Sequence, residues 1–223
     1  MTRINIICEG STEEAFVNKI LAPHFLTKGI VVTPRNLGKG DSYDKMRYNI
    51  LQWMKEENGA YVTTLIDLYG MNKGFPGYLA NKHKQPYDKV QAIEAAVNED
   101  IAKEGLDQSM FIPHFQLHEF EALLFSDPDL LQEWLSLDRP IKADTFKSIN
   151  DGFPSPEHIN DSPQTAPSKR ILGAVPSYSK VAEGVLIAED IGLEKIRGAC
   201  KHFDGWMTEL EGLAPGNAIM CVL

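Results

Sequence analysis

Short apolar runs alternate with amphipathic stretches along the first half of the chain. The apolar runs have the length of buried strands and contain many β-branched residues. Strands are expected at residues 4–8, 30–34, 60–66 and, interrupted by a proline, 110–117. Apolar residues at helical spacing predict helices at residues 11–28, 43–57 and 87–104. This alternation predicts an α/β fold in which a mainly parallel sheet is flanked by helices.

The pattern changes after about residue 125. A helical stretch begins near His118, and a second short helix follows Pro128. Residues 136–167 are rich in Pro, Ser, Asn and Asp, so an irregular segment is expected there, followed by a helical part over residues 168–212. We therefore predict two domains: an α/β domain over residues 1–135, and an irregular and helical C-terminal extension over residues 136–223 that packs on it.

The composition limits the partners of the chain. With 223 residues, 43% of them hydrophobic, the chain can form a sizeable core, but its net charge of -9 provides no general attraction for nucleic acid. A polyanion would have to be met by a local basic patch or by bound cations. The three cysteines lack the spacing of a zinc site, which suits a reducing cytoplasm. We also find no leader-like apolar segment at the N-terminus and no apolar run near about 20 residues. We therefore predict a cytoplasmic protein without a membrane span.

Two carboxylates stand where predicted buried strands end. Glu9 follows the first strand and Asp67 follows the third. The carboxyl ends of parallel strands share one edge of a sheet, so the two side chains meet there if the strands are neighbours. Paired carboxylates repel each other and call for a proton or a hard cation such as Mg²⁺. Glu13 lies one helical turn beyond Glu9 and is a further ligand candidate, although it and Glu14 also suit a helix start, where Ser11 and Glu14 fit a capping box.

A second acidic group follows the fourth predicted strand. Glu119 or Glu121 could reach the same sheet edge as Asp67, and the alternative is that both are ordinary acidic residues of a helix start. His114 and His118 are four residues apart, but they lie on either side of a strand-to-helix junction, so we do not predict a helical zinc pair.

A basic group lies in the C-terminal part. Lys169 and Lys180 are candidates for stabilising charge on a phosphate, and Arg170 and His118 for binding a substrate. The alternative for the basic residues is a solvated helix start. The chain has no GxxxxGK[ST], GxSxG or HExxH motif, which disfavours a P-loop NTPase, an α/β-hydrolase and a zincin.

The segment Glu-Gly-Ser-Thr-Glu-Glu over residues 9–14 resembles the EGxTE start of Toprim-like nucleases, and Asp67 resembles the first aspartate of their DxD motif. The wider pattern, including residues 117–125 and 166–170, is similar to a bacterial family of domains of unknown function, family 4276, that is grouped with the Toprim-like proteins. The resemblance implies a Toprim-like fold for residues 1–135.

The resemblance also implies a centre that cleaves phosphodiester bonds in DNA or RNA with Mg²⁺ or Mn²⁺. Glu9 would be the glutamate at the catalytic edge, with Glu13 and Asp67 as metal ligands. Related proteins often act beside an ABC-type or SMC-like ATPase in phage defence. The chain departs from the DxD motif because Tyr69 occupies the second position and is a poor Mg²⁺ ligand. Either Glu119 supplies the missing carboxylate, or the metal site is weakened or lost.

Two other functions remain open at this point. One is a non-catalytic interaction subunit that keeps a degenerate Toprim fold and docks on an ATPase. The other is a metal-dependent phosphohydrolase or phosphotransferase acting on small molecules. The clustered carboxylates favour the two enzymes, whereas the negative net charge favours the interaction subunit and the small-molecule enzyme.

Overall fold

A mainly parallel sheet organises the first half of the chain in the computed structural model. Its strands are β1 (Thr2–Cys8), β2 (Ile30–Asn36), β3 (Tyr61–Asp67), β4 (Phe111–Ile112) and β5 (Phe115–Gln116). The strand order is β2-β1-β3-β4, with β5 also paired to β3. The pairs β1–β2, β1–β3 and β3–β4 are all parallel, and Cys8 lies opposite Leu65. The predicted α/β class is confirmed, and so is the prediction that the first and third strands are neighbours.

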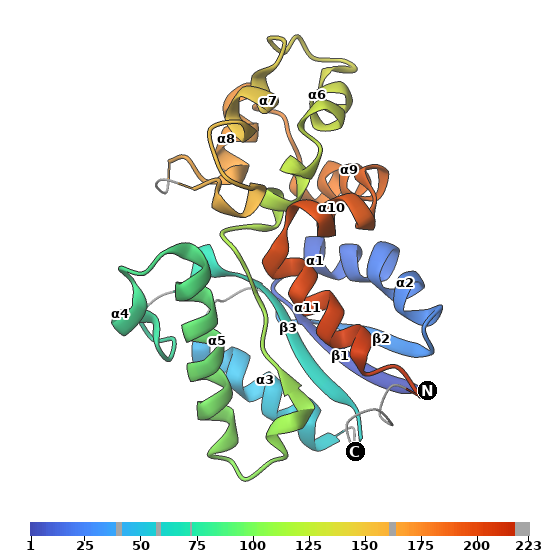
Figure 1. Cartoon of the computed structure of the whole chain (residues 1–223), viewed down its shortest axis with the longest axis vertical. Coiled ribbons are helices and arrows are strands. Elements are labelled where there is room, and N and C mark those ends of the chain that lie inside the picture. Colours follow the sequence, from blue (N-terminus) through green and yellow to red (C-terminus); the bar gives the residue numbers. More distant parts are fainter. Residues whose placement is uncertain (39–41, 57–58, 72, 161–163, 217–223) are drawn as a thin grey trace. The chain divides into compact units, whose positions relative to one another are not determined.

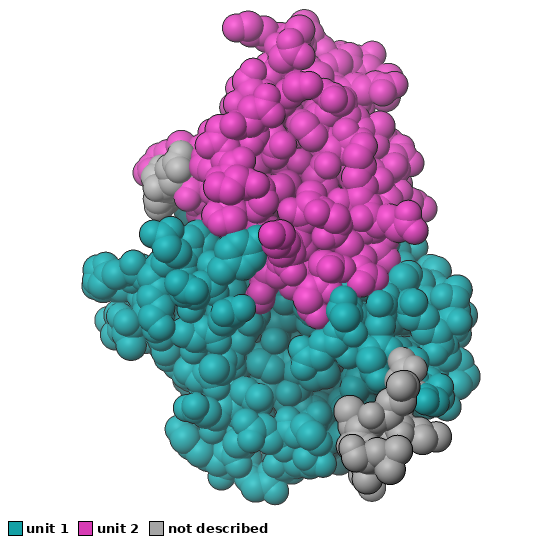
Figure 2. Space-filling model, in the orientation of Figure 1, with its two compact units in different colours: residues 1–115, 206–223 teal, residues 116–205 magenta. Residues whose placement is uncertain are grey.

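The structure describes residues 1–38, 42–56, 59–71, 73–160 and 164–216. They form two compact units, coloured separately in Figure 2. Unit 1 consists of Met1–Phe115 and Trp206–Leu223, and unit 2 of Gln116–Gly205. The predicted domain boundary between residues 135 and 136 stays a prediction. Within the described ranges, no helix combines the length and the apolar character that crossing a bilayer requires.

The helices of unit 1 cover both faces of its sheet (Figure 1). They are α1 (Ser11–Phe16), η1 (Val17–Leu21), α2 (Ala22–Leu26), α3 (Tyr43–Glu56), η2 (Leu68–Gly70), α4 (Tyr78–Asn81), α5 (Pro86–Ala102), η3 (Gln108–Met110) and the second half of α11 (Lys201–Gly212). Figure 1 shows α1 and α2 on one face and α3 and α5 on the other. Right-handed crossovers require this arrangement, because the chain steps from β1 to β2 in one direction and returns past β1 to β3.

The core of unit 1 lies on the two faces of the central strands. Residues Ile4 to Cys8 of β1 are all buried, which is typical of a parallel strand covered on both faces. Phe16 of α1, Ile50 of α3 and Ile93 of α5 are fully buried as well. One element departs from regular α-helix: η1 is a π-helical segment. We attribute it to Pro23, whose ring nitrogen cannot donate a helical hydrogen bond.

The predicted strand over residues 110–117 is present only as β4 and β5, two pieces of two residues each. Pro113 separates them and cannot donate to a ladder. The backbone carbonyl of His114 instead accepts a hydrogen bond from Thr64 Oγ1 at 2.7 Å, and its N–H donates to the same oxygen at 2.9 Å. A side chain of β3 therefore replaces the missing backbone pairing.

Unit 2 is built from short helices. They are η4 (Phe120–Ser126), α6 (Pro128–Ser136), α7 (Thr145–Asn150), η5 (Pro156–His158), α8 (Pro167–Ala174), η6 (Lys180–Gly184), α9 (Val185–Ile191), α10 (Leu193–Ala199) and the start of α11. The prediction that residues 136–167 are irregular is wrong for α7 and η5. Phe146 anchors α7 because its ring is fully buried and contacts Phe125 edge-on at 6.0 Å between ring centroids.

Candidate functional site

The end of β1 carries Glu9 to the carboxyl edge of the sheet in unit 1. The Glu9 N–H donates to the Leu65 carbonyl at 3.2 Å, so the pairing of β1 with β3 continues one residue beyond the strand. Asp67 is the last residue of β3 and is buried, whereas Glu9 is half-buried. Both carboxylates therefore lie where two neighbouring parallel strands end.

The Glu9 side chain reaches the neighbouring strand end. Its Oε2 accepts a hydrogen bond from the backbone N–H of Asp67 at 2.8 Å. Because the carboxyl carbon of an aspartate is three bonds from its own nitrogen, the two carboxyl groups lie within about 7 Å of each other. That separation is compatible with one ion or with a bridged pair of ions, which lie about 4 Å apart in two-metal sites.

Glu13 lies on the first turn of α1, and its side chain turns back toward Gly10. It is buried, and its Oε2 accepts the Gly10 N–H at 3.0 Å. The capping box expected from Ser11 and Glu14 is wrong by one residue: Gly10 is the N-cap, Ser11 is already helical, and Glu13 takes the N-cap N–H. Glu14 instead accepts from the side-chain amide of Asn36 at 2.7 Å.

The negative charges at this edge act on the neighbouring thiol. Burial raises the pKa of Cys8 above its usual range, and the charges of Glu13 and Glu14 raise it further. Cys8 is fully buried and stays protonated, so it serves as neither a nucleophile nor a thiolate ligand. The carboxylates are therefore the remaining candidates for chemistry at this edge.

The donor set of Glu9, Glu13 and Asp67 consists of carboxylate oxygens, which suits Mg²⁺ or Mn²⁺ rather than a soft metal. Two of the three carboxylates, Glu13 and Asp67, are buried, and burying such charges is costly without compensation. Tyr69 lies two residues after Asp67 in η2 and is exposed by 40%. The residues present fit a hard divalent cation.

In unit 2, Glu119 precedes η4, and its carboxylate contacts the start of α8. It is buried, and its Oε2 accepts the backbone N–H of Ser168, in the first turn of that helix, at 2.9 Å. This is a helix-capping contact made from a distant part of the chain. The carboxylate thus holds α8 against η4, and its predicted role as a metal ligand remains a prediction.

A pair formed by a buried acid and a half-buried base lies next to Glu119. The carboxylate of Glu121, exposed by only 1%, is 3.4 Å from the ammonium of Lys180. Burial raises the pKa of Glu121, the charge of Lys180 opposes the rise, and the charge of Glu119 adds to it. The hydroxyl of Tyr178 is buried beside the pair, and burial together with the charge of Glu121 raises its pKa beyond the usual tyrosine range. Lys180 is thereby held in position by an acid.

The other predicted residues of unit 2 have separate surroundings. Lys169 is exposed. Arg170 donates from Nε to the Thr165 carbonyl at 2.8 Å, and its guanidinium lies 5.0 Å from the centre of the Phe153 ring. His118 has a left-handed backbone, with φ of 65°, and its Nδ1 is 3.0 Å from the side-chain nitrogen of Asn160.

Each unit therefore has its own group of predicted site residues. Unit 1 brings Glu9 and Asp67 together and holds Glu13 at the adjacent Gly10, and unit 2 brings Glu119 and Lys180 together around Glu121. Joint action of the two groups remains a prediction. Sequence reasoning gave Glu121 little weight and missed Tyr178. A charge inside the apolar run of residues 120–125 was the available signal for Glu121.

Comparison with known proteins identifies the family. The family model described as "Domain of unknown function (DUF4276)" matches residues 8–211. The chain belongs to this family. The family predicted from the sequence is thus confirmed. No curated protein matches the chain.

Among solved structures, this DUF4276 chain is similar to the C-terminal regions of two OLD proteins. The region from Burkholderia pseudomallei has 15% identity and a TM-score of 0.47, and the match covers 95% of this chain and 99% of that one. The region from Xanthomonas campestris pv. campestris, in the structure phased with platinum, has 15% identity and a TM-score of 0.42, with coverage of 94% and 96%.

Proposed function

We propose that this DUF4276 protein is a metal-dependent nuclease that cleaves phosphodiester bonds in DNA or RNA. The observation that supports the proposal best is the hydrogen bond from the Asp67 backbone to the Glu9 carboxylate, which places two acids of neighbouring strand ends together. The resemblance of residues 9–14 to the EGxTE motif supports the same reaction class.

In this proposal Glu9, Glu13 and Asp67 hold Mg²⁺ or Mn²⁺, with Glu119 as a further ligand. A bound divalent ion would polarise the phosphate and lower the pKa of the attacking water. Asp67 is fixed by its place at the end of β3, and Glu9 is oriented by the Asp67 N–H. The Gly10 N–H holds one oxygen of Glu13. These contacts orient the carboxylates before an ion binds.

The basic residues of unit 2 complete the proposal. Lys180, held by Glu121, or Lys169 would stabilise the charge that develops on the phosphate. Arg170 and His118 would bind the substrate. Because the chain has a net charge of -9, nucleic acid must be attracted locally, and its binding should weaken steeply as salt rises.

The setting of the activity is part of the proposal. Cys8 and Cys200 are buried free thiols, which suits the reducing cytoplasm. An ABC-type ATPase partner and a role in phage defence follow from the resemblance to Toprim-like proteins.

Metal binding is the first test. Calorimetric titration of the purified protein with Mn²⁺ should give stoichiometric binding, and Glu9→Gln and Asp67→Asn should each abolish it. Glu14→Gln is the matched control, because Glu14 is on the same turn of α1 as Glu13 but accepts a hydrogen bond from Asn36. If both Glu9→Gln and Asp67→Asn bind Mn²⁺ with unchanged affinity, the carboxylates are not the ligands.

Cleavage is the second test. Labelled DNA and RNA are incubated with Mg²⁺ or Mn²⁺, with and without the product of a neighbouring ATPase gene. Loss of about 10³-fold in rate is expected for Asp67→Asn, at the upper end of what removing one charge-stabilising group costs. Cleavage that survives in Glu9→Gln refutes the assigned roles.

A phosphohydrolase of small molecules is the second candidate, and the net charge of -9 favours it because a small ester needs no extended basic surface. It would use the same carboxylates. Hydrolysis of a chromogenic phosphate monoester or diester by the wild type, lost in Asp67→Asn, while oligonucleotides stay intact, would favour this candidate over the nuclease. If neither substrate class is cleaved with the ATPase present, the interaction subunit is the remaining function.

A further inference from the structure

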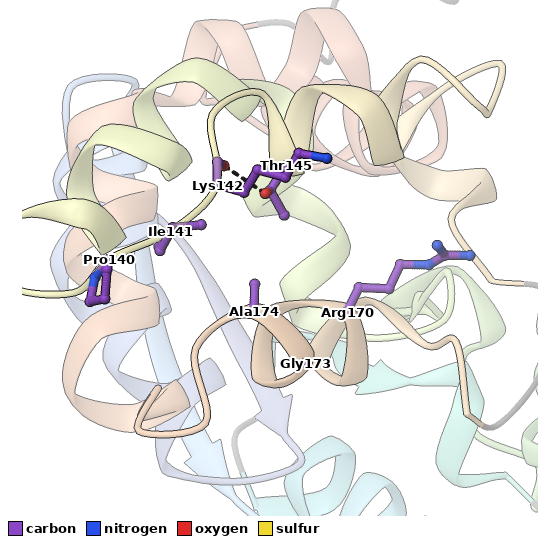
Figure 3. A pocket seen from close by; sticks show the side chains of 7 residues that line it. All are labelled: Pro140, Ile141, Lys142, Thr145, Arg170, Gly173 and Ala174. Carbon is purple, nitrogen blue, oxygen red and sulfur yellow. Dashed lines mark hydrogen bonds between the residues drawn. The ribbon is translucent and has the colours of Figure 1, made fainter.

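A pocket of about 320 Å³ opens within unit 2, away from the carboxylate contacts described above. It lies between the segment before α7, the first residue of α7 and the face of α8. Figure 3 shows its lining, which consists of Pro140, Ile141, Lys142, Thr145, Arg170, Gly173 and Ala174. The volume is within the range usual for small-ligand sites.

The charged residues of the lining are all positive. Its two charged residues, Lys142 and Arg170, are both cationic, and none of the lining residues is acidic. They come from different segments, and in Figure 3 their side chains extend toward the same side of the view, one above the pocket and one below it. In a chain with a net charge of -9, such a lining stands out. It favours an anion.

The Arg170 side chain is held in place. Its Nε donates to the Thr165 carbonyl at 2.8 Å, and Phe153 lies beside the guanidinium, 5.0 Å away. An arginine oriented by a carbonyl and an aromatic face loses less entropy when it binds a phosphate. Lys142 is exposed and supplies a second positive charge.

The remaining lining suits the rest of a nucleotide. Pro140, Ile141 and Ala174 supply apolar surface for a sugar or a base. The Thr145 hydroxyl donates to the Lys142 carbonyl at 2.7 Å, so its oxygen can accept a hydrogen bond from a ligand hydroxyl. Gly173 leaves the floor of the pocket open, since a Cβ built on it would meet nothing within 4 Å.

We propose that this pocket is a nucleotide-binding subsite in which Lys142 and Arg170 bind the phosphate. Its ligand is either one unit of the polynucleotide strand or a free nucleotide. The first identity rests on the proposed nuclease function, whereas binding of a free nucleotide does not.

The test measures binding to the full chain in EDTA, so that the carboxylates of unit 1 do not contribute through a metal. The probes are a fluorescent single-stranded oligonucleotide, as DNA and as RNA, and adenosine 5′-monophosphate. Gly173→Glu places a negative charge in the pocket and should weaken binding of the occupying probe at least about tenfold. Gly173→Gln, of nearly the same size without the charge, is the matched control and should weaken binding less.

Lys142→Ala provides a readout that a merely structural role would not change. It should lower the slope of log affinity against log salt for the oligonucleotide by about 0.7, the value for one phosphate contact on a single strand. Lys147→Ala, an exposed lysine of α7 outside the lining, should leave the slope unchanged.

The outcomes separate the two sources of phosphate. Binding of the oligonucleotide alone, weakened by Gly173→Glu, assigns the pocket to a strand, and an equal effect on adenosine 5′-monophosphate assigns it to a free nucleotide. The proposal is refuted if the wild type binds neither probe at millimolar concentration, or if Gly173→Glu binds both as tightly as the wild type. Either result leaves the metal and cleavage tests of Glu9 and Asp67 unaffected.

Discussion

The two units place their carboxylates in different parts of the fold. In unit 1, Glu9 and Asp67 lie at the ends of neighbouring parallel strands, where the fold itself presents side chains at one edge. In unit 2, Glu119 and Glu157 are buried, and their oxygens accept backbone N–H groups at the starts of α8 and α11, whereas the Glu9 carboxylate accepts one at the end of a strand. A buried glutamate is therefore not by itself a sign of chemistry. The proposed metal site rests instead on carboxylates at strand ends.

The largest expected effect concerns Glu157, whose oxygens accept the N–H groups of His202 and Phe203, each at 3.0 Å. Glu157→Ala should lower the free energy of unfolding by about 3 kcal/mol, because it leaves buried donors without a charged acceptor. Glu157→Gln should cost less, since its amide oxygen still accepts. Urea unfolding measures both changes in the free energy of unfolding. The control is Glu133→Ala, at an exposed position, whose free energy of unfolding should stay within about 0.5 kcal/mol of the wild type. A neutral Glu157→Ala would remove the contrast between the units.

In unit 1 the corresponding stabilisation should come from metal. Mn²⁺ at 100 times its dissociation constant should raise the free energy of unfolding by about 2.7 kcal/mol, because only the folded carboxylates bind it. Asp67→Asn should abolish this gain, whereas Glu157→Gln should keep it. Thermal unfolding with and without Mn²⁺ measures the difference. Equal stabilisation of Asp67→Asn and wild type would mean that the ion binds elsewhere.

Lys180→Met should destabilise unit 2 by about 2 kcal/mol at pH 7. Removing one member of a buried pair usually costs more, but the Lys180 side chain is 33% exposed, so water screens part of the loss. The pKa of Glu121 is already raised, and losing Lys180 raises it further. A carboxyl group whose pKa is higher in the folded state lowers the free energy of unfolding as the pH rises above its unfolded pKa, here near 4.5. The destabilisation caused by Lys180→Met should therefore grow from pH 4 to pH 8.

The double variant Glu121→Gln, Lys180→Met tests that explanation. It should recover most of the stability, and its difference from wild type should vary less with pH. Lys169→Met, at an exposed position, is the control. A penalty of Lys180→Met that is the same at pH 4 and pH 8 would contradict the pairing with Glu121 as its cause.

The smallest effect concerns Asp127, which caps α6 by accepting the Leu130 N–H at 3.1 Å and pairs with Lys195. Burial works against a low pKa, but these partners together hold the Asp127 pKa below its usual value. Asp127→Ala should cost about 1 kcal/mol at pH 7. A carboxyl group whose pKa is lower in the folded state stabilises the fold above its unfolded pKa of 3.8. The difference in stability between wild type and Asp127→Ala should therefore disappear as the pH falls through the lower folded pKa. Asp138→Ala, at an exposed position, is the control.

The amino-acid sequence by itself determined the sheet of unit 1 and the meeting of Glu9 with Asp67. Apolar runs separated by amphipathic stretches allow few arrangements, and parallel strands bring their carboxyl ends to one edge whatever the details of packing. The first and third strands are neighbours as predicted, so a local pattern was enough to place two residues 58 positions apart within reach of a hydrogen bond.

Only the tertiary structure decided the roles in unit 2. Glu119 and Glu121 are two residues apart, yet one caps α8 and the other pairs with Lys180, and no periodicity distinguishes them. The shift of the capping box from Ser11 to Gly10 and the pocket between α7 and α8 were equally hidden. Short helices have weak local signals, and their positions follow from which buried side chains, such as Phe146, find a partner far along the chain.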